Sequence, residues 1–197
     1  MNACTRHERG VTLIELLVGV AIIGLLVMVA APSFARFIDV QRLRSINAAL
    51  VTDIQFVRTE ATSRNVKVAL KFQGSGATMT CYAVVSGDHT LCNCTQTPGS
   101  ICGGGSAQRE IRTVQVLRDI GITVAVPASQ TIRDLRFDPA TGRVEIFTSD
   151  DWYPPTGPFL VEVSHPTVGT LRTAIEATGR PSTCSPGGTV SGVPACT

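Results

Sequence analysis

Cysteines are the residues of this 197-residue chain best suited to covalent chemistry. Seven are present, at Cys4, Cys81, Cys92, Cys94, Cys102, Cys184 and Cys196. In an oxidising compartment the last six could form up to three disulfides, and the sequence alone does not separate the many pairings. Cys184 and Cys196 enclose a Pro- and Gly-rich loop, so we expect them to pair, with a stabilisation of roughly 3 kcal/mol. The pairing of the other four stays open.

A zinc site is the alternative use of the central cysteines. Cys92, Cys94 and Cys102, with His89 nearby, supply the ligand types of a tetrahedral Cys3His site. A one-residue spacing between cysteines is unusual for structural zinc, and no second closely spaced pair follows. Disulfides are therefore favoured, and we expect no metal or other cofactor.

The remaining polar residues give no pattern of catalysis. His7 lies near the N-terminus, His165 precedes Pro166 in a predicted turn, and Asp150-Asp151 before Trp152 is typical of a solvated turn. The sequence has no phosphate-binding loop, catalytic triad or zinc-protease motif. We therefore expect no catalytic residue and no enzymatic activity.

A carboxylate stands at the start of the longest apolar run. Residues 16–35 carry no charge, and as a helix they would span about 30 Å, the thickness of a bilayer's hydrocarbon core. A secretory signal is the competing interpretation, but its apolar region is usually about 7–15 residues long. Glu15 lies directly before this run, where an ionised carboxylate needs a partner.

The string Gly10-Val11-Thr12-Leu13-Ile14-Glu15-Leu16, after a short polar leader, resembles the class III signal of type IV pilins and type II secretion pseudopilins. The resemblance implies that a prepilin peptidase cuts between Gly10 and Val11 and that Val11 is then N-methylated. It also implies that Glu15 is an assembly carboxylate, which meets the N-terminal amine of a neighbouring subunit. Val11 departs from the Phe or Met usual there. An ordinary membrane anchor, with Glu15 near the headgroups, is the alternative.

Hydrophobic periodicity predicts one long helix with two halves. We expect a leader over 1–10, a transmembrane or filament-core helix over 11–35, bent near Gly24 and Pro32, and its amphipathic continuation over 36–63. The apolar stripe of this second half consists of Phe37, Val40, Leu43, Leu50, Ile54, Val57 and Ala61.

A period of two begins after the helix and predicts a β-rich head over 64–197. A hairpin is expected from residues 66–72 and 78–85, turning at Gly74-Ser75-Gly76. Further strands are predicted at 110–117, 122–126, 135–137, 143–147, 159–164 and 171–176, with loops at 86–108 and 185–197. The fold class is therefore α+β, and the resemblance implies a type IV pilin fold, with the long helix packed on a mainly antiparallel sheet.

Within the head, the Phe137-Asp138-Pro139 segment leading to Gly142-Arg143-Val144, and Gly179-Arg180 followed by Cys184, resemble the FimT/GspH group of minor pilins and pseudopilins. This resemblance implies a non-catalytic subunit that assembles or primes a type IV pilus or a type II secretion pseudopilus. The implied partners are other pilins, the prepilin peptidase and an inner-membrane assembly platform. The implied location is a single-pass inner-membrane protein with a cytoplasmic N-terminus and a periplasmic head, which then enters the filament.

DNA uptake is the alternative function, because some FimT relatives bind DNA through a C-terminal Gly-Arg-x-Arg loop. The corresponding residues here are Gly179-Arg180-Pro181-Ser182, so the second arginine is missing. A formal net charge of +2 and 5% aromatic residues indicate no broad basic surface. Arg180 would need Arg172, Arg143 or Lys71 on the same face to bind phosphates usefully.

Overall fold

The computed structural model describes residues 12–73, 78–87, 91–103, 108–148 and 151–196. The chain divides into two compact units, residues 1–38 and 39–197. Helix α1 (Leu13–Arg64) supplies the described part of the first unit and continues into the second. Each unit is described by itself.

The first unit is helical from Leu13 onward. Within the described residues, no single helix is long and apolar enough to cross a membrane, although one bent pair, Leu13–Met28 with Ser33–Arg64, passes that test of length and composition together. The break between these two pieces contains Pro32, whose missing amide hydrogen interrupts the helical ladder. A bend near Pro32 was expected from the sequence.

The second unit begins with the amphipathic part of α1. Most of the predicted stripe is buried without exposed surface, namely Leu43, Leu50, Ile54, Val57 and Ala61. The prediction was wrong for Phe37, whose side chain is 56% exposed. Phe37 belongs to the first unit, which is helical from Leu13 onward. The helix ends at Arg64, and Asn65 follows with a positive φ of 52°, a conformation that asparagine tolerates at helix ends.

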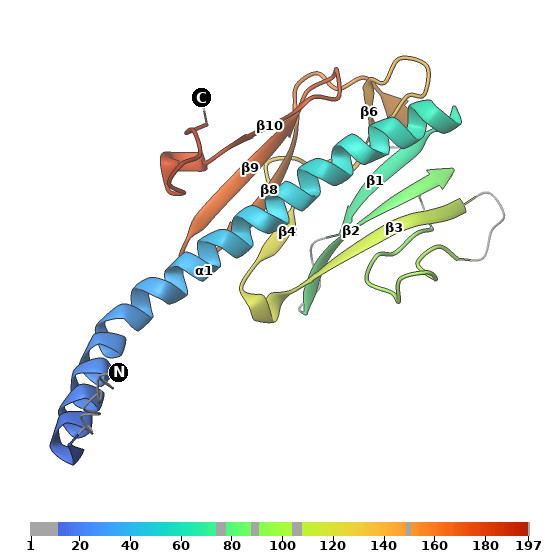
Figure 1. Ribbon diagram of the computed structural model, residues 1–197. Helices are drawn as coiled ribbons and strands as arrows, with labels where there is room; N and C mark the ends of the chain where they lie inside the picture. Colours follow the sequence, from blue (N-terminus) through green and yellow to red (C-terminus); the bar gives the residue numbers. More distant parts are fainter. Residues whose placement is uncertain (1–11, 74–77, 88–90, 104–107, 149–150, 197) are drawn as a thin grey trace, which may run out of the picture. The chain divides into compact units, whose positions relative to one another are not determined.

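Two antiparallel sheets complete the second unit (Figure 1). The six-stranded sheet has the order β3-β2-β1-β5-β6-β7 and the four-stranded sheet the order β10-β9-β8-β4. The strands of the first are β1 (Val68–Gln73), β2 (Met79–Gly87), β3 (Gln108–Leu117), β5 (Asp134–Phe137), β6 (Val144–Thr148) and β7 (Asp151–Tyr153). Those of the second are β4 (Thr123–Ala125), β8 (Phe159–His165), β9 (Gly169–Ile175) and β10 (Pro181–Cys184). Two short 3-10 helices, η1 (Arg118–Ile120) and η2 (Pro186–Gly188), follow β3 and β10.

The predicted α+β fold, with a long helix packed on antiparallel strands, is confirmed. Two local predictions are wrong. Asp151, expected with Asp150 in a solvated turn, begins the three-residue edge strand β7, while Asp150 lies outside the described residues. Pro181 and Ser182, expected in a loop, belong to β10, an edge strand in which a proline at the first position gives up no essential hydrogen bond. The expected turn at Gly74-Ser75-Gly76 lies outside the described residues.

The main core lies where α1 meets both sheets. Alternate residues of β1 and β8 point inward to it, as the period of two requires. The ring of Phe72 from β1 lies 5.6 Å from that of Tyr82 on β2 and 5.9 Å from that of Phe159 on β8, measured between centroids. Phe72 therefore joins the two sheets beside the helix.

Polar side chains fix the helix to each sheet. Asp53 of α1 is buried, accepts a hydrogen bond of 2.7 Å from the Tyr82 hydroxyl and forms an ion pair of 2.6 Å with Arg112 of β3. Burial, and then the hydrogen bond to Asp53, raise the pKa of Tyr82 far above its usual value, so the hydroxyl remains a donor. This cluster ties α1 to the six-stranded sheet.

A second cluster ties α1 to the four-stranded sheet. Asn47 accepts a hydrogen bond of 3.0 Å from the Thr173 hydroxyl on β9 and donates one of 3.3 Å to the Thr183 hydroxyl on β10. Asn47 and Thr173 are buried, where unpaired polar groups would be costly. The two clusters place the helix between the sheets, as Figure 1 shows.

A smaller core covers the opposite face of β1 and β2. It contains Ala69, Ala83 and Val85 of the sheet and Cys92, Cys94 and Ile101 of the loop over residues 91–103, together with Cys81. β2 is consequently buried at six successive positions, because both of its faces are covered. This loop, hereafter the cover loop (residues 91–103), closes the outer face of the sheet.

A β-bulge in the β2–β3 pairing makes two charged side chains of β3 point to opposite faces of the sheet. The register shifts between Val84, which pairs with Arg112, and Val85, which pairs with Glu110. In a regular strand residues 110 and 112 would point to the same face, but the extra residue separates them. Arg112 reaches Asp53 on the helix side, while Glu110 points to the cover loop.

Candidate functional site: the N-terminal helix and the head surface

The start of α1 carries the predicted assembly residue. Gly10 and Val11, the predicted cleavage and methylation residues, lie outside the described residues. The Thr12 hydroxyl accepts a hydrogen bond of 3.3 Å from the Glu15 amide, so Thr12 caps the helix and Glu15 is its third residue. This is half of a capping box, and it gives Glu15 a place at the positive end of the helix dipole.

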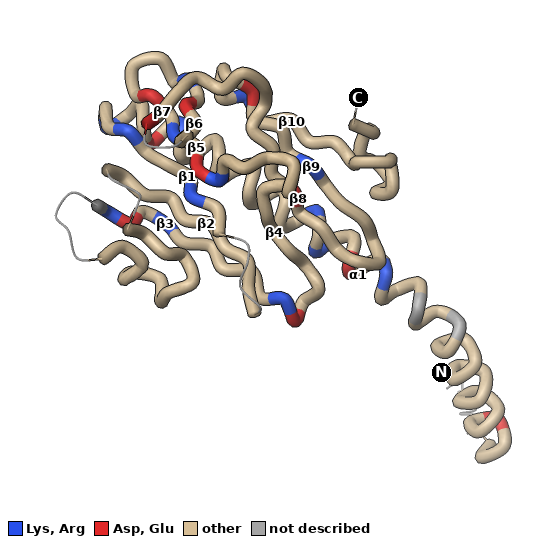
Figure 2. The backbone as a smooth tube through the Cα atoms, turned by 180° about the vertical axis from the view of Figure 1, so that it is seen from behind, with Lys and Arg blue, Asp and Glu red and all other residues tan. Residues whose placement is uncertain are grey.

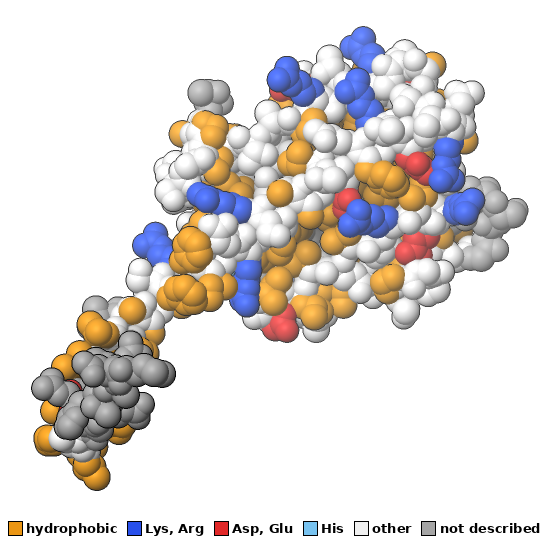
Figure 3. Space-filling model, viewed as in Figure 1, with side chains coloured by type: hydrophobic (Ala, Val, Ile, Leu, Met, Phe, Trp, Pro, Cys, Tyr) orange, Lys and Arg blue, Asp and Glu red, His pale blue; other side chains and the backbone are white. Residues whose placement is uncertain are grey.

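The first unit is apolar on all sides of its helix. Twelve large hydrophobic side chains between residues 13 and 28 are more than half exposed: Leu13, Ile14, Leu16, Leu17, Val18, Val20, Ile22, Ile23, Leu25, Leu26, Val27 and Met28. Figure 3 shows orange, hydrophobic side chains along the visible edges of this part of the chain. A helix that is apolar all round is stable only inside a membrane or against other apolar helices.

Three disulfides join the cysteines of the head. Cys81 pairs with Cys94 and Cys92 with Cys102, so the two links interleave along the sequence. The third joins Cys184 to Cys196, the pair expected from the sequence. The zinc alternative loses its thiolate ligands, because all three of its cysteines are disulfide-bonded; His89 lies outside the described residues.

The two arginines named as candidate DNA contacts have different surroundings. Arg172 lies on β9 and donates two hydrogen bonds, of 2.6 and 2.9 Å, to Glu162 on β8. Arg180 is exposed at the turn before β10. Lys71 lines a surface hollow together with Arg133 and Asp134.

Arg143 is the arginine that the fold brings towards Arg180. The turn between β5 and β6 and the turn between β9 and β10 are joined by a hydrogen bond of 3.0 Å from the Val144 amide to the Ala177 carbonyl. A Cβ atom on Gly179 would lie 3.0 Å from the Gly142 carbonyl oxygen and 2.7 Å from the Phe137 ring, and Gly179 has a φ of 79°, so only glycine fits there.

Arg58 of α1 approaches the same pair of turns. Its Nε atom lies 3.2 Å from the position of a Cβ on Gly142. Arg58, Arg143 and Arg180 are all exposed. These three residues, hereafter the arginine group, come from three distant parts of the sequence, which is why the spacing of motifs could not identify Arg58.

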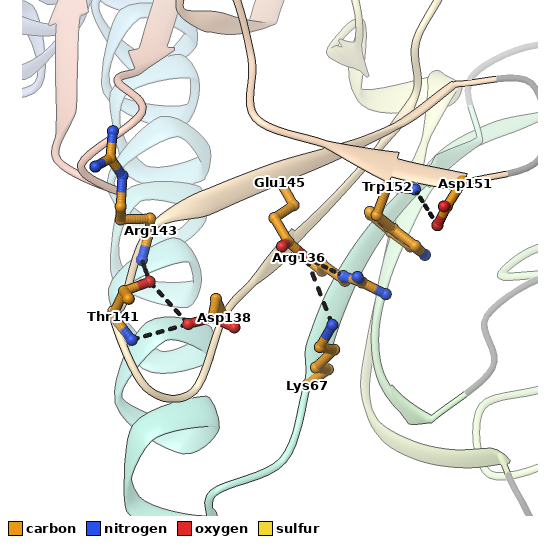
Figure 4. Close-up of polar contacts among 8 residues, drawn as sticks. All are labelled: Lys67, Arg136, Asp138, Thr141, Arg143, Glu145, Asp151 and Trp152. Carbon is orange, nitrogen blue, oxygen red and sulfur yellow. Dashed lines mark hydrogen bonds and ion pairs between the residues drawn. The ribbon is translucent and has the colours of Figure 1, made fainter.

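The turn that carries Arg143 is held by Asp138. Its carboxylate accepts hydrogen bonds of 2.8 and 2.9 Å from the hydroxyl and amide of Thr141, and these bonds lower the pKa of Asp138. Figure 4 shows the Arg143 side chain extending away from Asp138 and Thr141. The Asp138 carboxylate is therefore occupied by its own turn.

Elsewhere on the head, acidic and basic positions are interspersed along the backbone (Figure 2). On β5 and β6, Arg136 pairs with Glu145 at 2.5 Å and lies 4.3 Å from the Trp152 ring centroid, with Lys67 3.9 Å from the same carboxylate (Figure 4). The Glu145 carboxylate thus lies close to both cations of this group.

Comparison with known proteins bears first on the N-terminus. A profile described as the prokaryotic N-terminal methylation motif matches residues 5–31. The chain carries a prepilin-type N-terminal methylation motif. The resemblance predicted from Gly10 to Leu16 is thereby confirmed, and the motif overlaps the predicted leader from residue 5 and the apolar helix as far as residue 31.

Among solved structures, the chain is similar to two crystal forms of the type IV minor pilin FimU of Pseudomonas aeruginosa. One has 17% identity and a TM-score of 0.45, covering 72% of this chain and 87% of that chain. The other has 15% identity and a TM-score of 0.43, covering 76% and 98%. A comparison with curated proteins finds no match.

Proposed function

We propose that this protein is a non-catalytic minor pilin or pseudopilin, held in the inner membrane by its N-terminal helix and then assembled into a filament. The observation that carries the proposal is a methylation motif followed by a helix that exposes apolar side chains on every side. Such a helix needs lipid before assembly and neighbouring helices afterwards.

Glu15 would supply the specificity of assembly. A buried carboxylate and the N-terminal ammonium group of a neighbouring subunit would compensate each other's loss of hydration, and removal of one would strand the other. Processing between Gly10 and Val11 creates that ammonium group. Partners in this proposal are other pilin-type subunits, the prepilin peptidase and the assembly platform, with the head in the periplasm.

Substitutions at Glu15 distinguish assembly from helix capping. Glutamine can occupy the third position of a capping box, whereas alanine cannot. If Glu15 acts through its charge, Glu15→Gln and Glu15→Ala should both be processed and inserted but should be strongly depleted from sheared filaments. If Glu15 serves only the helix end, Glu15→Gln should assemble normally, and the assembly role would be rejected.

Binding of DNA is a second candidate function, supported by the proximity of the turns that carry Arg143 and Arg180. Three arginines could make about three phosphate contacts, and the logarithm of affinity should then fall with that of salt concentration with a slope of roughly 0.9 per contact. A gel-shift titration of the full chain in detergent across salt concentrations measures that slope.

The decisive comparison is between two arginines with different surroundings. Arg180→Ala should weaken binding and lower the salt slope by about one contact. Arg172→Ala, which breaks a pair with Glu162, should leave both nearly unchanged. Equal effects of the two substitutions, or no salt-sensitive binding, would remove the arginine group from consideration as a DNA site.

A further inference from the structure

The cover loop is held against the sheet by a disulfide and by polar side chains of the sheet, one of which is the carboxylate of Glu110. The Glu110 side chain accepts hydrogen bonds of 2.8 and 2.9 Å from the Gly99 amide and one of 3.3 Å from the Ile101 amide. It also accepts one of 2.7 Å from the Thr113 hydroxyl. An ionised carboxylate is acceptor-only, so this arrangement of three donors suits the charged form of Glu110.

The bulge in β3 makes this arrangement possible. In a regular strand Glu110 and Thr113 would point to opposite faces. The register shift places Glu110 opposite Val85 and Thr113 opposite Ala83, and both of these partners belong to the small outer core. Glu110 and Thr113 therefore share the face that the cover loop closes.

Beneath the cover loop lies an apolar surface. Ile101 is fully buried against the outer face of β1 and β2, and Ala83 and Val85 have almost no exposed surface. The disulfides Cys81–Cys94 and Cys92–Cys102 fasten the ends of the segment 95–101, whereas Glu110 fastens its middle. Gln115 of β3 donates hydrogen bonds of 2.8 Å to the Cys94 and Gln96 carbonyls, so this part of the loop has an anchor that does not titrate. Loss of the Glu110 bonds would therefore free residues 97–101 from β3 without breaking a covalent bond.

We propose that Glu110 is an acid-sensitive latch: its protonation releases residues 97–101 from β3 and exposes the apolar face beneath them, while the disulfides, the bonds from Gln115 and the main core stay intact. The inference is independent of the assembly role of the N-terminal helix. The outer face of the head would then expose its apolar side chains in acid, whereas the cover loop hides them at neutral pH.

The surroundings of Glu110 favour its charged form, so that the latch is closed at neutral pH. Loss of hydration, the largest effect, raises the pKa of Glu110, but the hydrogen bonds from Thr113, Gly99 and Ile101 together lower it below its usual 4.5. The charged residues lining the same surface hollow are Arg109 and Arg112, both from β3, and Arg112 is paired with Asp53. From the cover loop, Gly99 and Cys102 line this hollow, and Cys102 is disulfide-bonded.

The sign of the pH dependence follows from the lowered pKa. Closure is fully favoured above the usual value of 4.5 and is lost as the pH falls through the lower value of the folded protein. The test uses the oxidised full chain in detergent micelles, labelled with ¹⁵N at glycine, alanine and isoleucine. Amide exchange at Gly99, Ile101 and Ala83 is measured near neutral pH and at about pH 2.5, and each rate is divided by its intrinsic rate at that pH.

In the wild type, protection of Gly99 and Ile101 should fall at least about tenfold in acid while Ala83 stays protected. Glu110→Gln should show the low protection of Gly99 and Ile101 already at neutral pH. In Thr113→Val, the protection at neutral pH should lie between that of the wild type and that of Glu110→Gln. Glu162→Gln, a strand carboxylate remote from the cover loop, is the matched control and should behave as the wild type. Protection that does not change with pH, or that falls equally at Ala83, would overturn the latch.

Discussion

At the scale of single residues, a few buried polar side chains decide how the helix meets the head. Asp53 is 1% exposed and binds Tyr82 and Arg112, whereas Asn47 is 6% exposed and binds Thr173 and Thr183. Apolar packing alone would tolerate small rotations and shifts of the helix. A buried group that must meet its partner tolerates few of them, because an unpaired polar group in the core is costly.

The Asp53 cluster gives a direct prediction of stability. Tyr82→Phe removes the hydroxyl donor and leaves the buried Asp53 carboxylate with Arg112 alone, so the free energy of unfolding should fall by about 1–3 kcal/mol. Tyr153→Phe, at a ring that is 53% exposed, is the control and should change it little. Denaturant titration of both full-length variants in detergent measures the difference, and equal stabilities would contradict the assigned role of the cluster.

At the scale of elements, hydrophobic periodicity predicted α1 and most of the strands, because these elements bury one face and expose the other. It missed two edge strands, β7 and β10, although it predicted β4, an edge strand that is as short as β7. Neither β7, with three residues, nor β10, with four residues and a proline at its start, shows an apolar alternation. β10 is nevertheless well defined, since it pairs with β9 from Pro181 to Cys184.

The bulge in β3 is an element whose effect the sequence could not reveal. Residues 108–117 look like one regular strand, and a two-residue period would place Glu110 and Arg112 on the same face. The register shift assigns them to opposite sides. The roles of both charges therefore depend on the pairing with β2, which is a long-range property of the fold.

The disulfide between Cys184 and Cys196 holds the C-terminal segment against β10, and its contribution to stability can be measured. Beyond β10 the chain folds back, with the Ser185 amide bonded to the Pro194 carbonyl at 2.8 Å, and Val190 is buried. Replacing Cys184 and Cys196 together by serine should lower the free energy of unfolding by about 3 kcal/mol on the chain-entropy estimate. Denaturant titration, with the wild type under the same oxidising conditions as reference, measures the loss; an unchanged midpoint would show that non-covalent contacts suffice to hold the loop.

At the scale of the whole molecule, the chain combines a helix that cannot remain exposed to water with a head that has its own core. The methylation motif was predictable from the sequence because it is a pattern of consecutive residues. The pairing of four central cysteines and the approach of Arg58 to Gly142 were not, because both arise from contacts between distant segments.

We propose that the N-terminus of this protein is processed and assembled as that of a pilin. The most direct test is the intact mass and N-terminal peptide of the protein, expressed with and without its prepilin peptidase. We expect a peptidase-dependent product that begins at methylated Val11 and has lost Met1 to Gly10, together with Cys4. A chain that keeps its first ten residues in both hosts, or one cut after Ala31, would contradict the proposed pilin pathway.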